Sequence, residues 1–289
     1  MSNVILITGT SSGVGFELSL LLAKQGHRVY ATMRNLDKRG PLEERAKADG
    51  VELKIARLDV QEVESITACV GAILEAEGQL DVLVNNAGVG FLRTTEQATE
   101  DEIQWQLDVN LMGVIRCTKA VLPHMREAQS GRIVTVTSVG GLVGQPFNEI
   151  YCAAKFAVEG YIEALASYVQ PSFGILFTLI EPGGISTEFA NSALQQFQQG
   201  GGMQDDAYRP ILERYIHKAT SRTEKGESGT YQTPTEVAQV IVDCIAADDP
   251  PLRTRTSEWS EAFCRLKTEA DPTGRKLSQA VYDRFLGDG

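Results

Sequence analysis

The chain contains 289 residues, 43% of them hydrophobic and 22% charged, a mixture typical of a globular protein that excludes a disordered or fibrous one. Its formal net charge of −11 would be repelled by nucleic-acid phosphates and anionic lipids, so neither is an expected partner.

The five cysteines are widely spread and lack Cys-x-x-Cys spacing, so they predict neither a disulfide framework nor a zinc site. The N-terminal sequence MSNVILIT has no basic region before a long apolar run. No window of the sequence approaches the roughly 18 apolar residues of a membrane span. We therefore expect a cytoplasmic protein without a membrane span.

Short aliphatic, β-rich runs alternate with stretches of helical spacing along the first two-thirds of the chain. The runs predict strands at residues 4–8, 29–33, 53–59, 81–85, 133–138 and 175–181, and the pattern between them predicts helices that include residues 16–24, 63–77 and 101–125. Runs such as VILI and DVLV are continuously apolar, as in strands covered on both faces. The alternation predicts an α/β fold, a doubly wound (Rossmann) parallel sheet in a single domain over residues 1–289.

The pattern changes after Thr187, where residues 187–232 include a polar stretch with three consecutive glycines, Gly200 to Gly202. We predict that this segment is an insertion that forms a lid over the substrate. The sequence TPTEVAQVI then predicts a helix, because Thr233 and Glu236 have capping-box spacing. Residues 251–256 predict a short edge strand, and residues 257–289 predict an extended C-terminal helical end whose packing anchors are Trp259, Phe263, Tyr282 and Phe285.

The sequence TGTSSGVG directly follows the first predicted strand and begins a helix. Glycine at positions 9, 13 and 15 lets the backbone turn tightly and approach a dinucleotide pyrophosphate at the helix N-terminus. The spacing G-x-x-x-G-x-G differs from G-x-G-x-x-G, and a glycine-rich connection can also be an ordinary loop. Its place between strand and helix favours a cofactor site formed by Gly9, Ser11, Ser12, Gly13, Val14 and Gly15.

The end of the second predicted strand carries Arg34, where an acidic residue would bind the ribose hydroxyls of NAD. A guanidinium suits the 2′-phosphate of NADP, and the hydroxyl of Ser11 or Ser12 can add a donor. Alternatively, Arg34 is a solvated surface residue, and the nearby Asp37 keeps NAD possible. The sequence therefore favours NADP(H) as the cofactor and leaves NAD(H) open.

Tyr151 and Lys155 are four residues apart in YCAAK and share one face of a predicted helix. A tyrosine with a pKa near 10 is a poor acid–base group at neutral pH, but a neighbouring ammonium lowers that pKa. Ser138, at the end of the preceding strand, can hydrogen-bond the same substrate oxygen. Alone, such a pair is usually a solvated helical pair. Together with the dinucleotide turn, it indicates hydride transfer between a nicotinamide and a carbonyl or secondary alcohol.

These motifs resemble those of the short-chain dehydrogenase/reductase family, from residue 4 to about residue 187. TGTSSGVG resembles the cofactor turn of that family, NNAG at residues 85–88 its central-strand motif, and Asn110 in VNLMG its active-site asparagine. Ser138, Tyr151 and Lys155 resemble its catalytic serine, tyrosine and lysine. The resemblance implies a catalytic set of Asn110, Ser138, Tyr151 and Lys155, although Asn110 alone could be a helix-interior asparagine satisfied by local backbone.

The same resemblance implies three further groups of cofactor contacts, beside the adenine, its ribose and the nicotinamide. In chain order these are Asp59 and Val60 at the adenine, Asn86, Ala87 and Gly88 at its ribose, and Pro182, Gly183, Ile185 and Thr187 at the nicotinamide. It also implies that Tyr151 and Lys155 contact the cofactor, and that Asn110 holds a water that links Lys155 to solvent.

The C-terminal third resembles the branch of hydroxysteroid and retinol dehydrogenases, which have a longer C-terminal end. The shared features are TSSGVG followed by VYATMRN, the insertion after Thr187, and TPTEVA followed by LRTRT. The branch implies a bulky lipophilic ketone or alcohol as the small-molecule substrate. The family implies a homodimer or homotetramer, with the helices at residues 101–125 and 151–169 as candidate contacts.

Two alternatives fit parts of the pattern. NAD(P)-dependent dehydratases and epimerases, the extended relatives of this family, also use a Tyr–Lys pair, but their cofactor turn usually reads TGxxGxxG. A non-catalytic, dinucleotide-binding regulator could use the same fold, but it predicts a damaged catalytic set. His27, His124 and His217 show no ligand spacing and predict no metal site. His217 in the predicted lid is either exposed or in contact with the far end of a substrate.

Overall fold

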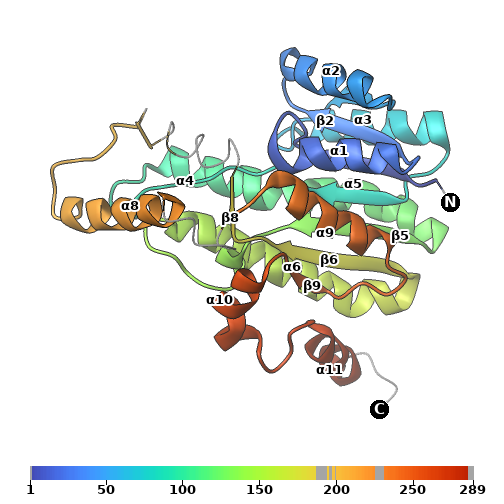
Figure 1. Cartoon of the computed structure of the whole chain (residues 1–289). Coiled ribbons are helices and arrows are strands. Elements are labelled where there is room, and N and C mark those ends of the chain that lie inside the picture. Colours follow the sequence, from blue (N-terminus) through green and yellow to red (C-terminus); the bar gives the residue numbers. More distant parts are fainter. Residues whose placement is uncertain (1, 187–193, 195–196, 199, 225–230, 286–289) are drawn as a thin grey trace.

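The computed structural model describes residues 2–186, 194, 197–198, 200–224 and 231–285. Seven parallel strands form one sheet in the order β3-β2-β1-β4-β5-β6-β9 (Figure 1). They are β1 (Val4–Thr8), β2 (Arg28–Met33), β3 (Lys54–Arg57), β4 (Val82–Asn85), β5 (Gly131–Val136), β6 (Ile175–Glu181) and β9 (Arg253–Arg255). The strand order reverses between β1 and β4, which confirms the predicted doubly wound sheet.

Helices cover both faces of the sheet, which is why its central strands are continuously apolar. The side chains of α3 (Val63–Glu77), α5 (Gly113–Ala128) and α6 (Glu149–Phe173) pack on one face. On the other face lie α1 (Gly13–Lys24), α2 (Gly40–Asp49) and α9 (Pro234–Ala246). Every residue of β1 and β4 is buried between these layers.

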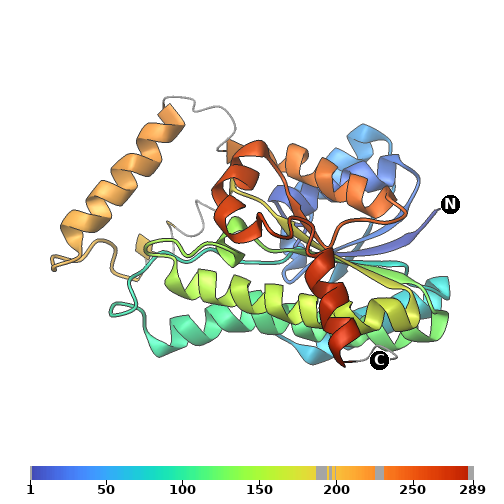
Figure 2. The same ribbon diagram turned by 90° about the horizontal axis from the view of Figure 1, so that it is seen from below.

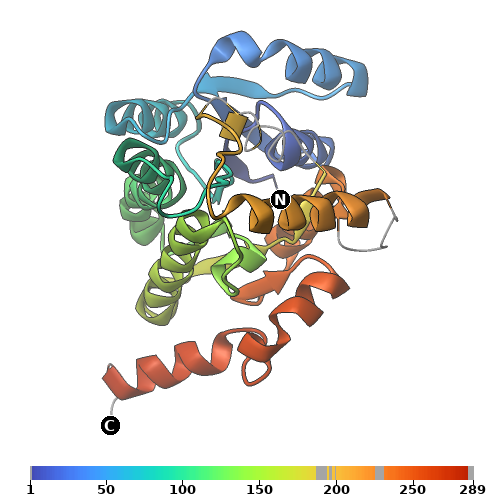
Figure 3. The same ribbon diagram turned by 90° about the vertical axis from the view of Figure 1, so that its left-hand side faces the viewer.

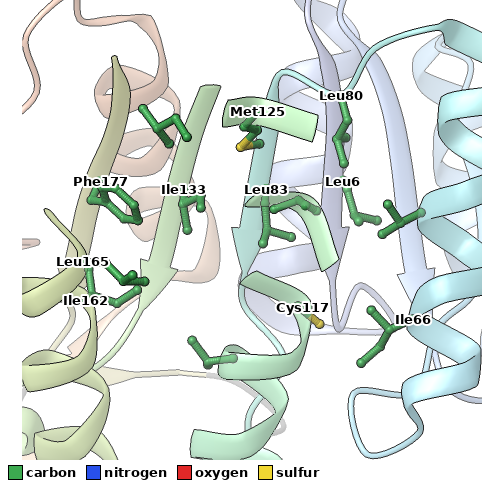
Figure 4. Packing of buried hydrophobic residues seen from close by; sticks show 14 of the residues in the cluster. Leu6, Ile66, Leu80, Leu83, Cys117, Met125, Ile133, Ile162, Leu165 and Phe177 are labelled. Carbon is green, nitrogen blue, oxygen red and sulfur yellow. The ribbon is translucent and has the colours of Figure 1, made fainter. Parts of the chain in front are cut away.

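On the first face of the sheet, large side chains of neighbouring strands pack against one another. Leu6, Leu83, Ile133 and Phe177 come from four neighbouring strands and belong to one buried cluster with residues of the covering helices, such as Ile66 (Figure 4). Because alternate residues of a strand point to the same face, each strand supplies its aliphatic side chains to both layers. This rigid sheet fixes the positions of the loops that follow β1, β4, β5 and β6.

The helix predicted at residues 101–125 is interrupted. It consists of α4 (Glu100–Leu107), a π-helical turn (Asp108–Met112) and α5. The turn carries Asn110, whose side chain bonds to a residue outside the helix. At Gly113, a Cβ atom would lie 2.9 Å from the side chain of Val60, so only glycine fits this contact. Single π-helical turns within α-helices occur often at functional sites.

The C-terminal part adds the predicted edge strand β9 and two helices, α10 (Glu258–Thr268) and α11 (Arg275–Phe285) (Figure 1). The capping box of Thr233 and Glu236 begins α9 as predicted. Trp259 and Phe263 stack with ring centroids 4.9 Å apart, but Phe285 is 72% exposed and is not the packing anchor expected from the sequence. The short α11 is only half-buried, at Ser278, Val281 and Tyr282, and Phe285 is its last residue.

A second, two-stranded sheet was not expected from the sequence. It pairs β7 (Gly184–Ile185) with β8 (Tyr231–Gln232), and α8 (Arg209–Glu224) lies between them in the chain. Viewed at right angles to Figure 1, α8 extends away from the main sheet, whereas α11 lies outside the β9 edge of the sheet and packs against α6 (Figures 2 and 3). None of the helices in the described part of the chain is long and apolar enough to span a membrane.

Candidate active site

The loop that follows β1 contains the predicted cofactor turn, and its glycines are required by close packing. Gly9 has a φ of +72°, and a Cβ atom on it would lie 2.7 Å from the Cα of Ala87. A Cβ on Gly15 would lie 2.5 Å from the side-chain nitrogen of Asn86. Both contacts are with the segment that follows β4. These two glycines therefore let the loops after β1 and β4 touch, in addition to any approach to a cofactor.

Thr8, which the sequence analysis did not single out, joins the same two loops. Its hydroxyl oxygen accepts hydrogen bonds from the backbone N–H groups of Asn86 and Ala87, both at 3.0 Å. The Asn86 side chain donates in return to the carbonyl oxygens of Thr8 and Gly9, both at 2.9 Å. Asn86 and Ala87 thus shape the turn itself. The sequence feature that could have indicated this role is the position of Thr8 directly before the glycine-rich turn.

The N-terminus of α1 has the chemistry of an anion site. Ser12 occupies its N-cap position in an extended conformation, its side chain makes no capping bond, and the first turn contains no acidic residue. The free N–H groups and the positive end of the helix dipole therefore suit a pyrophosphate. The residues present thus fit a dinucleotide.

Arg34 lies beside this turn because β1 and β2 run in register. Thr8 pairs with Thr32, and both the backbone N–H and the hydroxyl of Thr10 donate to the carbonyl oxygen of Thr32, at 3.0 and 3.1 Å. Arg34 follows two residues later and is exposed. Asp37 is also exposed, and its backbone N–H is bound by Asn35. A guanidinium beside the turn fits a phosphate on the adenine ribose.

Ser138, Tyr151 and Lys155 come together where β5 ends and α6 begins. β5 ends at Val136, so Ser138 lies beyond the strand predicted to contain it and begins a short 3₁₀ turn. Its hydroxyl oxygen accepts from the N–H of Gly140 at 2.9 Å, and its side chain hydrogen-bonds Tyr151. Nζ of Lys155 donates to the carbonyl oxygen of Val136 at 3.0 Å and lies 5.8 Å from the centroid of the Tyr151 ring.

The proton affinities of this group differ from the sequence-based expectation. Burial raises the pKa of Tyr151 to about 12, and the hydrogen bond from Ser138 only partly opposes this effect. Burial also lowers the pKa of Lys155 to about 8, against the opposing influence of Glu159. The expected lowering of the tyrosine pKa was wrong for the polypeptide alone, because desolvation outweighs the hydrogen bond from Ser138. The hydroxyl of Tyr151 is consequently protonated at neutral pH.

Asn110 is fully buried in the π-helical turn and binds a distant loop instead of local backbone. Its side-chain oxygen accepts from the N–H of Val89 at 3.0 Å, and its nitrogen donates to the carbonyl oxygen of Val89 at 2.8 Å. A Cβ atom on Gly88 would lie 2.9 Å from Oδ1 of Asn110 and 3.7 Å from Nζ of Lys155. Asn110 therefore holds the loop after β4 against Lys155.

The remaining expected cofactor contacts follow the carboxyl ends of β3 and β6. Asp59, after β3, accepts at 3.0 Å from the N–H of Gln61, and Val60 is buried against α5. After β6, the carbonyl oxygen of Pro182 accepts from the N–H of Val139 at 3.0 Å. Gly183 packs on Trp259 of α10, where a Cβ atom would lie 3.0 Å from the ring, and Ile185 lies in β7. Thr187 lies outside the described residues.

The histidines do not gather into a site. Nδ1 of His27 accepts from the N–H of Asn3 at 3.1 Å, and Nε2 of His124 accepts from the N–H of Leu80 at 3.3 Å. His217 is exposed on α8. Within the part of the chain that the structure describes, no group of His, Cys, Asp and Glu side chains could hold a metal ion.

Comparison with known proteins decides the family. The model of the short chain dehydrogenase family matches residues 3–198. The chain belongs to the short-chain dehydrogenase/reductase family. Retinol dehydrogenase 8 of Bos taurus is 42% identical over 274 residues, which cover 93% of this chain and 86% of that protein. 17-beta-hydroxysteroid dehydrogenase type 1 of Homo sapiens is 38% identical over 291 residues, which cover 99% and 86%. The predicted hydroxysteroid and retinol branch is confirmed.

Solved structures agree with this assignment. A short chain dehydrogenase/reductase of Burkholderia phymatum in complex with NAD superposes with a TM-score of 0.77 at 26% identity, over 93% of each chain. Actinorhodin polyketide ketoreductase with NADPH has a TM-score of 0.71 at 32% identity, over 85% of this chain and 90% of that one. The chain is therefore an oxidoreductase with a nicotinamide dinucleotide as cofactor. One of these two neighbours contains NAD and the other NADPH.

The predicted lid of this short-chain dehydrogenase is described only in part, and its described residues pack beside the catalytic segment. Phe147, which lies between Ser138 and Tyr151, forms a buried cluster with Phe197 and Leu212. Its ring also lies 5.3 Å from that of Tyr215 on α8, whose hydroxyl binds Nδ2 of Asn148 at 3.2 Å. An aromatic and aliphatic cluster therefore packs against the segment between Ser138 and Tyr151.

Proposed function

We propose that this enzyme is an NADP(H)-dependent carbonyl reductase that transfers a hydride between the nicotinamide and a bulky lipophilic ketone or secondary alcohol. The observation that carries the proposal is the arrangement of Ser138, Tyr151 and Lys155 beside the glycine-rich turn, with Asn110 behind them. All four members of the catalytic set are present. A regulator without activity would not need this arrangement.

Tyr151 is the acid that protonates the substrate oxygen during reduction. Its pKa of about 12 keeps the hydroxyl protonated at neutral pH, and the hydrogen bond between Ser138 and Tyr151 supports a role for Ser138 in binding the same oxygen. Lys155, charged below its pKa of about 8, stabilises the tyrosinate that forms when the proton leaves. A nicotinamide held beside Tyr151 and Lys155 would supply the hydride for reduction and accept it in oxidation.

The preference for NADP(H) rests on Arg34, which is exposed beside the turn and can pair with a 2′-phosphate. The hydroxyl groups of Ser11 and Ser12 would add hydrogen-bond donors to the same phosphate. NAD(H) remains the alternative cofactor because Asp37 is near. The proposed cofactor site comprises the glycine-rich turn, Arg34, Tyr151, Lys155 and the strand-end residues Asp59, Val60, Asn86, Ala87, Gly88, Pro182, Gly183, Ile185 and Thr187.

The substrate class is inferred from the relatives and from the lid. The matched relatives are named for retinol and for 17-beta-hydroxysteroids. The buried cluster of Phe147, Phe197 and Leu212 shows that the described part of the lid is apolar on its inner side, which supports a lipophilic substrate. We propose that residues 187–232 cover a substrate of this class, with the carbonyl directed towards Tyr151.

The proposed setting is a homodimer or homotetramer in the cytoplasm. Phe156 and Tyr168 on α6 are 41% and 44% exposed, which favours a contact between copies along this helix. All five cysteines are free and buried, as expected of a protein kept in a reducing compartment. Light scattering at micromolar concentration should give a mass of at least two chains, and a mass of 31.5 kDa would contradict the assembly.

The experiment that tests the function is steady-state oxidation of NADPH and of NADH with a panel of steroid ketones, retinoid aldehydes and small aromatic ketones. We expect turnover with NADPH and the bulky carbonyls. Tight NADPH binding without turnover on any carbonyl would instead support the regulator or the dehydratase and epimerase alternatives. Preference for small, polar ketones would contradict the substrate class.

A further inference from the structure

Two buried carboxyl groups and two arginines lie directly behind the catalytic lysine. Glu159 on α6 is 4% exposed, and Glu181 at the end of β6 is fully buried. Arg253 and Arg255 reach them from the edge strand β9, which lies beside β6 (Figure 1). Nε of Arg253 is 3.2 Å from Glu159 and 3.5 Å from Glu181, and Arg255 is 3.1 Å from Glu181. We call these four residues the carboxyl–arginine cluster.

Glu159 connects this cluster to the candidate active site at three points. It lies one helical turn beyond Lys155, and its negative charge favours the ammonium form of that lysine. The hydroxyl of Thr137, which directly precedes Ser138, donates to Glu159 at 2.6 Å. A Cβ atom on Gly141 would lie 2.9 Å from the Glu159 side chain, so the turn that carries Ser138 packs on it.

The charges around the cluster do not balance if every carboxyl group is ionised. Arg253 and Arg255 face Glu159 and Glu181, and each also pairs with one outer carboxylate, Glu163 on α6 and Glu261 on α10. The thiol of Cys264 on α10 stays neutral, since burial raises its pKa to about 12. Four carboxyl groups therefore meet two guanidinium groups.

One proton on the inner pair relieves this imbalance. Oε1 of Glu181 is buried and has no hydrogen-bond partner among the described residues, although Nε of Arg253 lies 3.5 Å away. Burial raises the pKa of both Glu159 and Glu181, and the negative charge of each opposes ionisation of the other, so the pair shares one proton. Thr137 and Arg253 donate hydrogen bonds to Glu159 and favour its ionised form, so the proton lies on Glu181, which can donate to Glu159. Glu159 then remains ionised, bound by Thr137, Arg253 and Glu181.

We propose that Glu159 is a positioning residue for catalysis, which keeps Lys155 charged and orients Ser138 through Thr137, and that Arg253 of the edge strand holds Glu159 in place. This inference rests on the proposed function for its kinetic consequence. It makes β9, which lies outside the matched residues 3–198, part of the machinery that supports the active site.

The test is the titration of Lys155, compared between the wild-type enzyme and Glu159→Gln. The titration is followed by the 13C resonance of the Cε carbon of Lys155, and the resonance is assigned by its loss in Lys155→Arg. Glutamine preserves the volume and the acceptor for Thr137 but removes the charge. We expect the midpoint to move to lower pH by about one unit, because an ammonium that loses a nearby anion is less favoured. The high-pH limb of kcat for ketone reduction should move by the same amount, while KM for NADPH stays within about twofold.

Two further variants separate this role from a purely structural one. Glu163→Gln removes a carboxylate that also pairs with Arg253, but one turn farther from Lys155, and should leave the Lys155 midpoint unchanged. Glu159→Asp retains the charge, so its Lys155 midpoint should lie close to that of the wild-type enzyme. If Glu159→Gln does not fold, Thr137→Val is the alternative variant, because it removes the hydrogen bond that stabilises the ionised form of Glu159. It should move the Lys155 midpoint in the same direction by a smaller amount.

An unchanged Lys155 midpoint in Glu159→Gln, or an equal shift in Glu163→Gln, would overturn the inference. The resonance titration needs no turnover, so it decides the inference even if no carbonyl is reduced. If the wild-type enzyme reduces ketones through Tyr151 while the midpoint does not move, only the inference fails. If the midpoint moves but no carbonyl is reduced, only the proposed function fails.

Discussion

Ketone reduction by this enzyme should weaken as the pH rises through about 8. Lys155 is 5% exposed, and burial lowers its pKa to about 8, so its ammonium is present below that pH and lost above it. Tyr151, with a pKa of about 12, stays protonated over the same interval. With a midpoint near 8, the charged fraction of Lys155 falls from about nine-tenths at pH 7 to about one-tenth at pH 9, so kcat should fall about tenfold.

The assay is the initial rate of NADPH oxidation at saturating ketone and cofactor between pH 6.5 and 9.5, with kcat extracted at each pH. Lys155→Arg is the matched control, because a guanidinium stays charged throughout this range. We expect a lower but pH-independent kcat in this variant. A flat wild-type profile, or a limb that persists in Lys155→Arg, would refute the assignment of this titration to Lys155.

Two further substitutions test the cofactor turn. Arg34→Ala should weaken NADPH binding about tenfold or more and leave NADH binding unchanged, because only NADPH has a 2′-phosphate to pair; Lys38→Ala is the control in calorimetric titrations, and equal losses for both cofactors would contradict the preference. Gly9→Ala should lower the free energy of unfolding by about 2–5 kcal/mol, since it combines a positive φ with a 2.7 Å contact to Ala87. Gly26→Ala, at φ +84° with nothing within 4 Å, isolates the backbone cost in urea unfolding. Similar losses in both glycine variants would show that the contact contributes nothing.

The sheet was predictable because its signals are local. β1 and β4 are buried on both faces, and this alone produces continuous apolar runs. The capping box before α9 is equally local, as is the four-residue spacing of Tyr151 and Lys155. The pairing of β7 with β8 was not predictable, since each strand has two residues and they are joined by a long intervening segment.

The electrostatics of the site depended on contacts that no local pattern reveals. Arg253 and Glu159 are 94 positions apart, and only the packing of β9 against β6 and α6 brings them together. The pKa of Tyr151 was misjudged for a related reason. The spacing to Lys155 is visible in the sequence, whereas the burial that raises the pKa of the tyrosine and lowers that of the lysine appears only in the folded chain.

The most direct test of the account is the turnover of Tyr151→Phe with NADPH and a bulky ketone, measured beside NADPH binding to the same variant. Phenylalanine keeps the ring and removes only the proton that the account assigns to the substrate oxygen. We predict that kcat falls at least about 100-fold, the scale of general acid catalysis, while the dissociation constant of NADPH changes little. Near-normal turnover in Tyr151→Phe would contradict the central role of this tyrosine.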